Sequence, residues 1–173
     1  SGESVVFKVT SSRLGVISFN RPKALNAADI GMSTRILEQL RAWEADGCVD
    51  AILLRSGSER AFCSGGDVKA IALALRDNPS SPLPDQALAA EYELLCAIHA
   101  SHLPTIALAD GVTMGFGLGL ALACDHRVAT DRTLVAMPEC AIGLFPDVGF
   151  AHWTREKPAV GLWMALTGAR LGA

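Results

Sequence analysis

The chain is organised around one stretch, MPECAIGLFPDVG, which occupies residues 137–149. It places two carboxylates, Glu139 and Asp147, in an otherwise apolar run that prolines and glycines break into turns. An ionised carboxylate is unfavourable among apolar groups unless it is paired, and burial raises its pKa. A general acid or base requires such tuning, so both residues are candidate catalytic groups. Considered alone, the stretch is also compatible with a buried acid that caps a helix and an exposed turn aspartate.

Composition limits the class of protein. The 173 residues carry a net charge of −3 and half of them are hydrophobic, which indicates one domain with a sizeable core. No basic surplus suggests a nucleic-acid partner, and no apolar stretch predicts a membrane partner or a membrane span. We expect no signal peptide at Ser1–Glu3. Five scattered cysteines without a CxxC pair are typical of free thiols, and no Cys/His spacing predicts a metal site.

The pattern of apolar residues predicts alternating strands and helices, and therefore an α/β fold. Residues 5–10 and 14–19 alternate and are rich in β-branched residues, as expected of a hairpin. Further strands are expected at residues 51–54, 105–110, 126–129 and 134–136. Helices are expected at residues 29–46, 68–76, 86–100, 161–166 and in a segment that ends near residue 124. Residues 77–85 hold three prolines and two serines, and we expect a mobile loop there.

Two glycine-containing turns precede expected helices. The first, AFCSGGD at residues 61–67, either offers backbone N–H groups to an anion or a polarised carbonyl, or is an ordinary strand-to-helix turn. The second has glycines at positions 115, 117 and 119, where close packing or a closely bound ligand is the expected reason. A Rossmann fingerprint would need glycine or alanine at Leu120, and Ser64 is not in a G-x-S-x-G elbow. These two readings are therefore excluded.

Four stretches, taken in order, carry a family resemblance: NRPKALN (20–26), AFCSGGDVK (61–69), residues 110–120 and MPECAIGLFPDVG (137–149). Together they resemble the crotonase (enoyl-CoA hydratase/isomerase) superfamily over nearly the whole chain, and within it most closely the 3-hydroxyisobutyryl-CoA hydrolases. The resemblance implies a ClpP/crotonase-like spiral of ββα units in a single domain, residues 1–173. It also implies an acyl-CoA substrate, a homo-oligomer and no cofactor apart from the coenzyme A of the substrate. The implied location is the cytoplasm of a bacterium or the mitochondrial matrix of a eukaryote.

The resemblance also assigns binding residues by their position in the motifs. Those near the adenine and phosphates of CoA would be Lys23, Ala24 and Leu25, and those near the pantetheine and thioester would be Ser64, Asp67, Val68 and Lys69. The backbone N–H groups of Gly66 and Phe116 would form an oxyanion hole for the thioester oxygen. One such donor is typically worth ~3 kcal/mol of transition-state stabilisation.

The same resemblance gives roles to three acids. In the hydrolase subgroup, the glutamate that matches Glu139 attacks the thioester carbonyl or activates water. The aspartate that matches Asp147 holds the acyl hydroxyl or helps to move a proton, and the glutamate that matches Glu91 contacts substrate. Two-carboxylate hydratases carry a second glutamate at the position of Gly119, so this chain lacks the usual pair for hydrating a double bond.

Two departures from the family pattern keep alternatives open. Phe116 stands where the subgroup usually has glycine, and family members continue well past the position of Ala173. We therefore expect a chain whose C-terminal helical part is missing. A thioester hydrolase is favoured. The first alternative is an enoyl- or dienoyl-CoA isomerase or hydratase, because dienoyl-CoA isomerases also place a Glu and an Asp eight residues apart. The second is a non-catalytic acyl-CoA-binding or assembly subunit.

Overall fold

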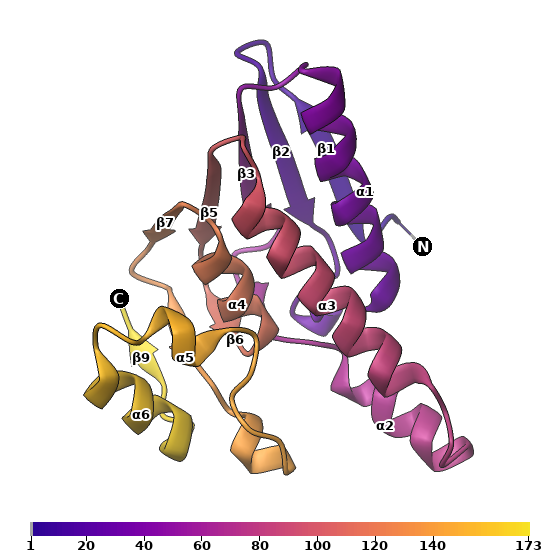
Figure 1. Ribbon diagram of the computed structural model, residues 1–173, viewed down its shortest axis with the longest axis vertical. Helices are drawn as coiled ribbons and strands as arrows, with labels where there is room; N and C mark the ends of the chain where they lie inside the picture. The colour runs from indigo at the N-terminus through magenta and orange to yellow at the C-terminus, as the bar shows by residue number, and fades with distance from the viewer. Residues whose placement is uncertain (1) are drawn as a thin grey trace.

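A computed structural model describes residues 2–173, which fold around two sheets (Figure 1). The chain begins with an antiparallel hairpin, as the sequence predicts. Its second strand pairs in parallel with the next one, and the remaining neighbours of this sheet are also parallel. The five strands, in spatial order, are β1 (Val5–Val9), β2 (Leu14–Phe19), β3 (Ala51–Ser56), β5 (Thr105–Ala109) and β7 (His126–Ala129).

The second sheet is built mainly from strands that each follow a strand of the first sheet, and it is completed by a strand that follows the last helix. It contains β4 (Ala61–Cys63), β6 (Val112–Met114), β8 (Leu134–Ala136) and the short β9 (Leu171–Gly172), in that order. The chain therefore passes from β3 to β4, from β5 to β6 and from β7 to β8, changing sheet each time. Helices follow β4 and β6, so the unit that repeats is two strands and a helix. This confirms the predicted α/β spiral of ββα units.

Two long helices, α1 (Ile30–Asp46) and α3 (Leu83–Ala100), pack together and lie in front of the five-stranded sheet in Figure 1. Helix α1 begins where the carboxylate of Asp29 accepts a hydrogen bond from the N–H of Met32, and ends at Gly47 in the left-handed conformation. Its apolar face joins the core. Within residues 2–173, no helix combines the length and apolar character needed to cross a bilayer.

The prediction of a loop over residues 77–85 is wrong in the length of the loop. Helix α2 (Val68–Asp77) runs to Asp77 and α3 begins at Leu83, so the connection is only residues 78–82. The reason is that Pro84 lies in the first turn of α3, where its missing N–H costs nothing and its fixed φ suits the helix. Similarly, the last helix, α6 (Pro158–Thr167), starts at a proline, earlier than the predicted residue 161.

The remaining elements are short, and several of them surround the cavity described below. They are the 3-10 turns η1 (Pro22–Ala24) and η2 (Glu139–Ile142) and the helices α4 (Phe116–Ala123) and α5 (Phe150–Trp153). The NRPKALN stretch that contains η1 is fixed by Asn26, which is fully buried. The Asn26 side chain donates hydrogen bonds to the carbonyls of Ala61 and Phe62 at 2.9 and 3.1 Å. This stretch is thus anchored to β4.

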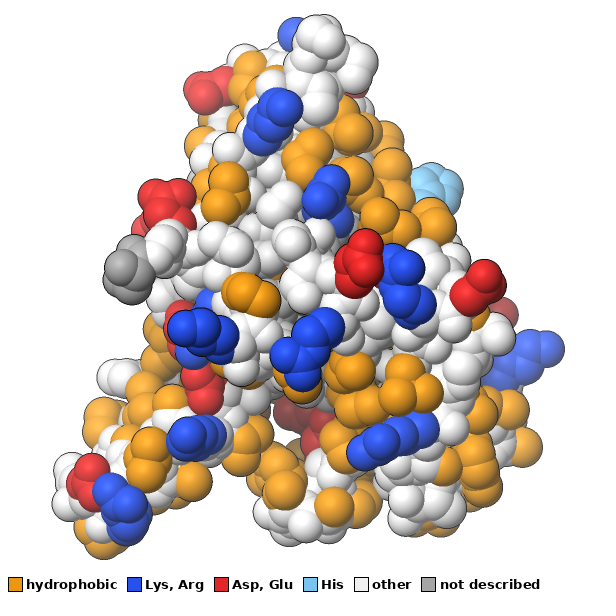
Figure 2. Space-filling view, turned by 180° about the vertical axis from the view of Figure 1, so that it is seen from behind, with side chains coloured by type: hydrophobic (Ala, Val, Ile, Leu, Met, Phe, Trp, Pro, Cys, Tyr) orange, Lys and Arg blue, Asp and Glu red, His pale blue; other side chains and the backbone are white. Residues whose placement is uncertain are grey.

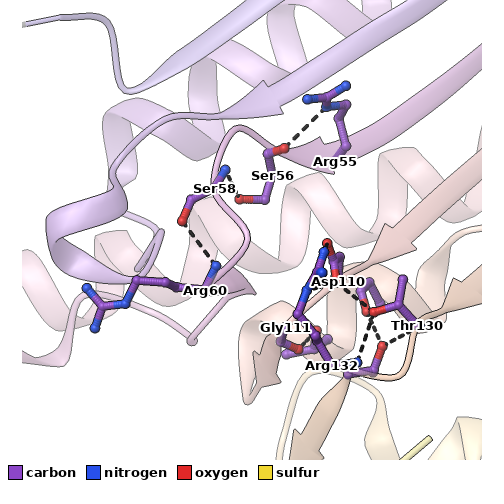
Figure 3. A network of polar contacts seen from close by, with 11 residues as sticks. Arg55, Ser56, Ser58, Arg60, Asp110, Gly111, Thr130 and Arg132 are labelled. Atoms are coloured by element: carbon purple, nitrogen blue, oxygen red, sulfur yellow. Dashed lines mark hydrogen bonds and ion pairs between the residues drawn. The ribbon is translucent and has the colours of Figure 1, made fainter.

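Polar contacts close the turns at which the chain changes sheet (Figure 3). In the turn after β5, the carboxylate of Asp110 accepts hydrogen bonds from Thr130 at 2.6 Å and from Arg132 at 3.1 Å, which ties it to the turn after β7. In the turn after β3, the hydroxyl of Ser56 accepts a hydrogen bond from the N–H of Ser58 at 2.8 Å. These polar groups are satisfied inside the chain, so their role is structural.

The glycines at positions 117 and 119 are explained by close packing. A Cβ added at Gly117 would lie 2.7 Å from the carbonyl carbon of Cys63, so α4 touches the backbone of β4. A Cβ added at Gly119 would lie 2.8 Å from the Cβ of Val148. Gly115 has φ of +51°, which a side chain rarely adopts. Close packing, one of the two reasons expected from the sequence, therefore holds at 117 and 119.

The contact between α4 and β4 gives a first prediction. Gly117→Ala is expected to destabilise the protein by about 2 kcal/mol or more, because the added methyl group overlaps a strand backbone that cannot move away. Urea unfolding measures the effect. The matched control is Gly172→Ala, where an added Cβ meets no atom within 4 Å. Equal unfolding midpoints for the two variants would contradict the prediction.

Candidate active site

Three acidic side chains line one cavity of about 310 Å³. Glu91 comes from α3, Glu139 is the first residue of η2, and Asp147 lies in the turn before α5. Figure 2 shows acidic atoms at the bottom of a hollow on this side of the molecule, with apolar side chains around it. The structure thus brings together the three acids that the sequence analysis singled out, and neither Glu139 nor Asp147 lies in a long helix.

Burial dominates the electrostatics of these acids. Glu91 and Glu139 are each 8% exposed, and Asp147 is half-buried. Burial, with a smaller effect from the charge of Asp147, raises the pKa of Glu139, and burial also raises the pKa of Asp147. The pKa of Glu91 rises to about 8, first through burial and then through the charges of Asp147 and Glu139. At neutral pH, Glu91 therefore holds its proton.

Two backbone N–H groups are also available at the cavity. Gly66 lies in the turn before α2 and Phe116 is the first residue of α4, and both line the cavity. Within residues 2–173, neither N–H donates a hydrogen bond to a protein acceptor. Free donors at the start of a helix suit a site where negative charge develops. The oxyanion-hole assignment is thus supported by the place of both residues in the lining of the same cavity, and it stays a prediction.

The turn that carries Asp147 is held by a contact with α3. Val148, which follows Asp147, has φ of +46° and is only 2% exposed. Its N–H donates a hydrogen bond to the hydroxyl of Tyr92 at 3.0 Å. Because Tyr92 follows Glu91 on the same helix, α3 positions both Glu91 and the turn that carries Asp147. Sequence reasoning assigned Tyr92 no role, since nothing local marks a partner 56 residues away.

The predicted CoA-binding residues fall into different surroundings. Ser64 and Val68 line the cavity. The Asp67 carboxylate accepts the N–H of Ala70 at 3.1 Å as the cap of α2. It also pairs with Arg21 at 2.8 Å, which gives it a structural role.

The other predicted CoA-binding residues lie outside the cavity lining. Lys23 and Lys69 are exposed and Ala24 is part of η1. The carbonyl of Leu25 accepts the N–H of Ser64 at 3.1 Å, which places η1 beside the cavity turn. Binding of CoA by these residues stays a prediction.

The two-sheet spiral and its acid-lined cavity define a crotonase-fold protein. The chain belongs to the enoyl-CoA hydratase/isomerase family, whose model matches residues 14–173. This confirms the family resemblance of the sequence motifs.

Curated relatives and solved structures agree with this assignment. A relative from Danio rerio named "3-hydroxyisobutyryl-CoA hydrolase, mitochondrial" is 43% identical over 99% of this chain and 44% of its own length. The Homo sapiens protein of that name is 42% identical over 91% of this chain and 40% of its own. A carnitinyl-CoA dehydratase structure from Mycobacterium thermoresistibile has a TM-score of 0.91 and 38% identity, covering 99% of this chain and 50% of that one. The chain thus spans less than half the length of these curated relatives.

The raised pKa of Glu91 predicts a pH-dependent stability. The native state keeps this proton up to about pH 8, whereas the unfolded chain releases it near 4.5, so wild-type stability is lost as the pH rises through this window. Glu91→Gln removes that loss. The variant's stability relative to wild type is expected to rise by about 2–4 kcal/mol between roughly pH 5 and 8. Urea unfolding at several pH values measures this difference.

The control for that experiment is Glu93→Gln, which changes an exposed glutamate on the same helix. This variant should not reproduce the rise in relative stability that is expected for Glu91→Gln. If Glu91→Gln and Glu93→Gln give parallel curves, Glu91 does not hold a proton in the native protein.

The Tyr92 contact predicts a second effect on stability. Tyr92→Phe leaves the ring but removes the acceptor of the buried Val148 N–H, so we expect a loss of about 1–2 kcal/mol. Urea unfolding of the variant and wild type checks this value. A variant as stable as wild type would show that water replaces the hydroxyl.

Proposed function

We propose that the whole protein hydrolyses a 3-hydroxyacyl-CoA thioester of the 3-hydroxyisobutyryl-CoA type. The observation that carries the proposal is one cavity lined by buried Glu139, by Asp147, and by Gly66 and Phe116, whose backbone N–H groups have no protein acceptor among residues 2–173. The names of the curated relatives, at 42–45% identity, support the same chemistry. Coenzyme A enters as part of the substrate, and the proposal needs no further cofactor.

The proposed reaction follows from these groups. Glu139 takes a proton from a water molecule, whose oxygen forms a bond to the thioester carbonyl carbon. The N–H groups of Gly66 and Phe116 donate hydrogen bonds to the oxyanion that results. The carbon–sulfur bond then breaks, and the CoA thiolate leaves and takes up the proton that Glu139 removed from water, giving the free acid and a thiol and restoring the ionised Glu139. Asp147 accepts a hydrogen bond from the hydroxyl of the acyl group and so orients it.

Packing at Gly119 argues against a two-glutamate hydratase. The space that a side chain at position 119 would need is occupied by Val148. An isomerase is the second candidate, because Glu139 and Asp147 line one cavity and both have raised pKa values suited to moving a proton.

Assembly and location are proposed on separate grounds. Helix α6 exposes Leu162, Trp163 and Leu166, an apolar surface of the kind that mediates association, so we propose a homo-oligomer. The curated relatives reported above are named as mitochondrial proteins. For a eukaryotic source we accordingly propose the mitochondrial matrix, and for a bacterial source the cytoplasm.

Glu139→Gln in the full-length protein tests the reaction. Because the amide cannot accept the proton of water, thiol release from 3-hydroxyisobutyryl-CoA is expected to fall at least ~100-fold, with binding of the CoA ester retained. Thiol release is followed with a thiol reagent, and binding by calorimetry. Glu156→Gln, at an exposed position, is the control. Near wild-type turnover in Glu139→Gln would remove Glu139 from the reaction. No thiol release by wild type, with a change in dienoyl-CoA absorbance, would favour the isomerase.

A further inference from the structure

The cavity is lined by more carboxyl groups than can be ionised together at neutral pH. Glu91, Glu139 and Asp147 all line it, and within residues 2–173 no Lys, Arg or His does so. Carboxylates that share a site without a cation cannot all be ionised at neutral pH, and a more buried carboxyl keeps its proton in preference to a less buried one. Asp147 is less buried than the two glutamates, so it is not the group that keeps the proton. The proposed hydrolysis needs Glu139 as an ionised base. The proton is therefore assigned to Glu91.

The groups around Glu91 support this assignment. Glu139 faces it from η2 and Asp147 from the turn before α5, and both raise its pKa. The thiol of Cys63 on β4 is buried and neutral, with a pKa of about 12, and the Tyr92 hydroxyl on its own helix has a raised pKa. None of these groups supplies a positive charge that would stabilise an ionised Glu91.

The carboxyl group of Glu91 lies against Gly66, one of the two residues proposed for the oxyanion hole. A Cβ added at Gly66 would meet Oε1 of Glu91, with Cδ at 3.4 Å. Within the described residues, this carboxyl group makes no hydrogen bond to the protein. An anion at this place would repel the oxyanion, whereas a neutral carboxyl can donate its O–H to an oxygen of the substrate.

We propose that Glu91 acts in its neutral form, as a third hydrogen-bond donor to the acyl thioester beside Gly66. The inference rests on the proposed thioester hydrolysis and deepens it. Glu139 then works as the ionised base, while Glu91 gives up no proton and only donates a hydrogen bond. Loss of the Glu91 proton at alkaline pH turns a donor into a repelling anion, so the rate falls with rising pH.

The test compares three forms of the full-length protein across pH: wild type, Glu91→Gln and Glu91→Ala. Hydrolysis of 3-hydroxyisobutyryl-CoA is measured between roughly pH 6 and 9.5, after subtraction of the uncatalysed rate. Glutamine keeps a neutral donor, so Glu91→Gln should stay within ~10-fold of wild type at its optimum and lose the decline near pH 8. Alanine removes the donor and should cost at least ~100-fold in kcat. Circular dichroism confirms folding of each variant.

Two outcomes overturn the donor role: a Glu91→Gln variant as slow as Glu91→Ala, or one that keeps the wild-type alkaline decline. Infrared spectroscopy supplies a readout independent of activity. The C=O stretch of a protonated carboxyl is expected at neutral pH in wild type and in Glu139→Gln, and not in Glu91→Gln. Absence of this band in wild type overturns the proposal. A wild type that shows the band but releases no thiol overturns the proposed function, and the donor role with it, while the protonation of Glu91 stands.

Discussion

The architecture depends on the contact of one helix with one strand. Helix α4 touches β4 so closely that position 117 has no room for a side chain, because the Cys63 backbone occupies that space. Residues 64–66 follow Cys63 directly, and Phe116 directly precedes Gly117, so this contact brings two separate turns to the same cavity. Strand β4 also pairs with β6, which ends just before Phe116, so the sheet holds the same two turns close together. Wider spacing of α4 and β4 would move the backbone amides of Gly66 and Phe116 apart.

The cavity places carboxyl groups in an environment where a protein interior ordinarily has apolar side chains. Three carboxyl groups are buried or half-buried in a lining that is otherwise mostly apolar. One oxygen of Glu139 is fully buried and has no hydrogen-bond partner within the described residues. Unsatisfied buried acids cost stability, so a fold retains them where their perturbed acidity is useful. The polar turns between the sheets, where each group has a partner, show the opposite arrangement.

The sequence predicted features that depend on local pattern. The hairpin, the alternation of strands and helices, and Glu139 and Asp147 as unusual acids could all be found from residue spacing and turn residues. The predicted loop over residues 77–85 is longer than the observed connection, because proline can begin a helix as well as break one. Glu91 came only from the family resemblance, since the pattern of α3 does not distinguish the acid that faces a cavity from those that face solvent. The contact of Tyr92 with Val148 is tertiary, and no local signal indicates it.

The packing of Gly119 on Val148 bears on how such a fold changes its chemistry. A glutamate at position 119 would need the volume that Val148 now fills. Val148 in turn has a strained backbone conformation next to Asp147. A passage to the acid pair of a two-glutamate hydratase would thus require both positions to change together, because either substitution by itself leaves a clash or a void. Such coupling would limit laboratory redesign as well as evolution, because neither position can change freely while the other stays the same.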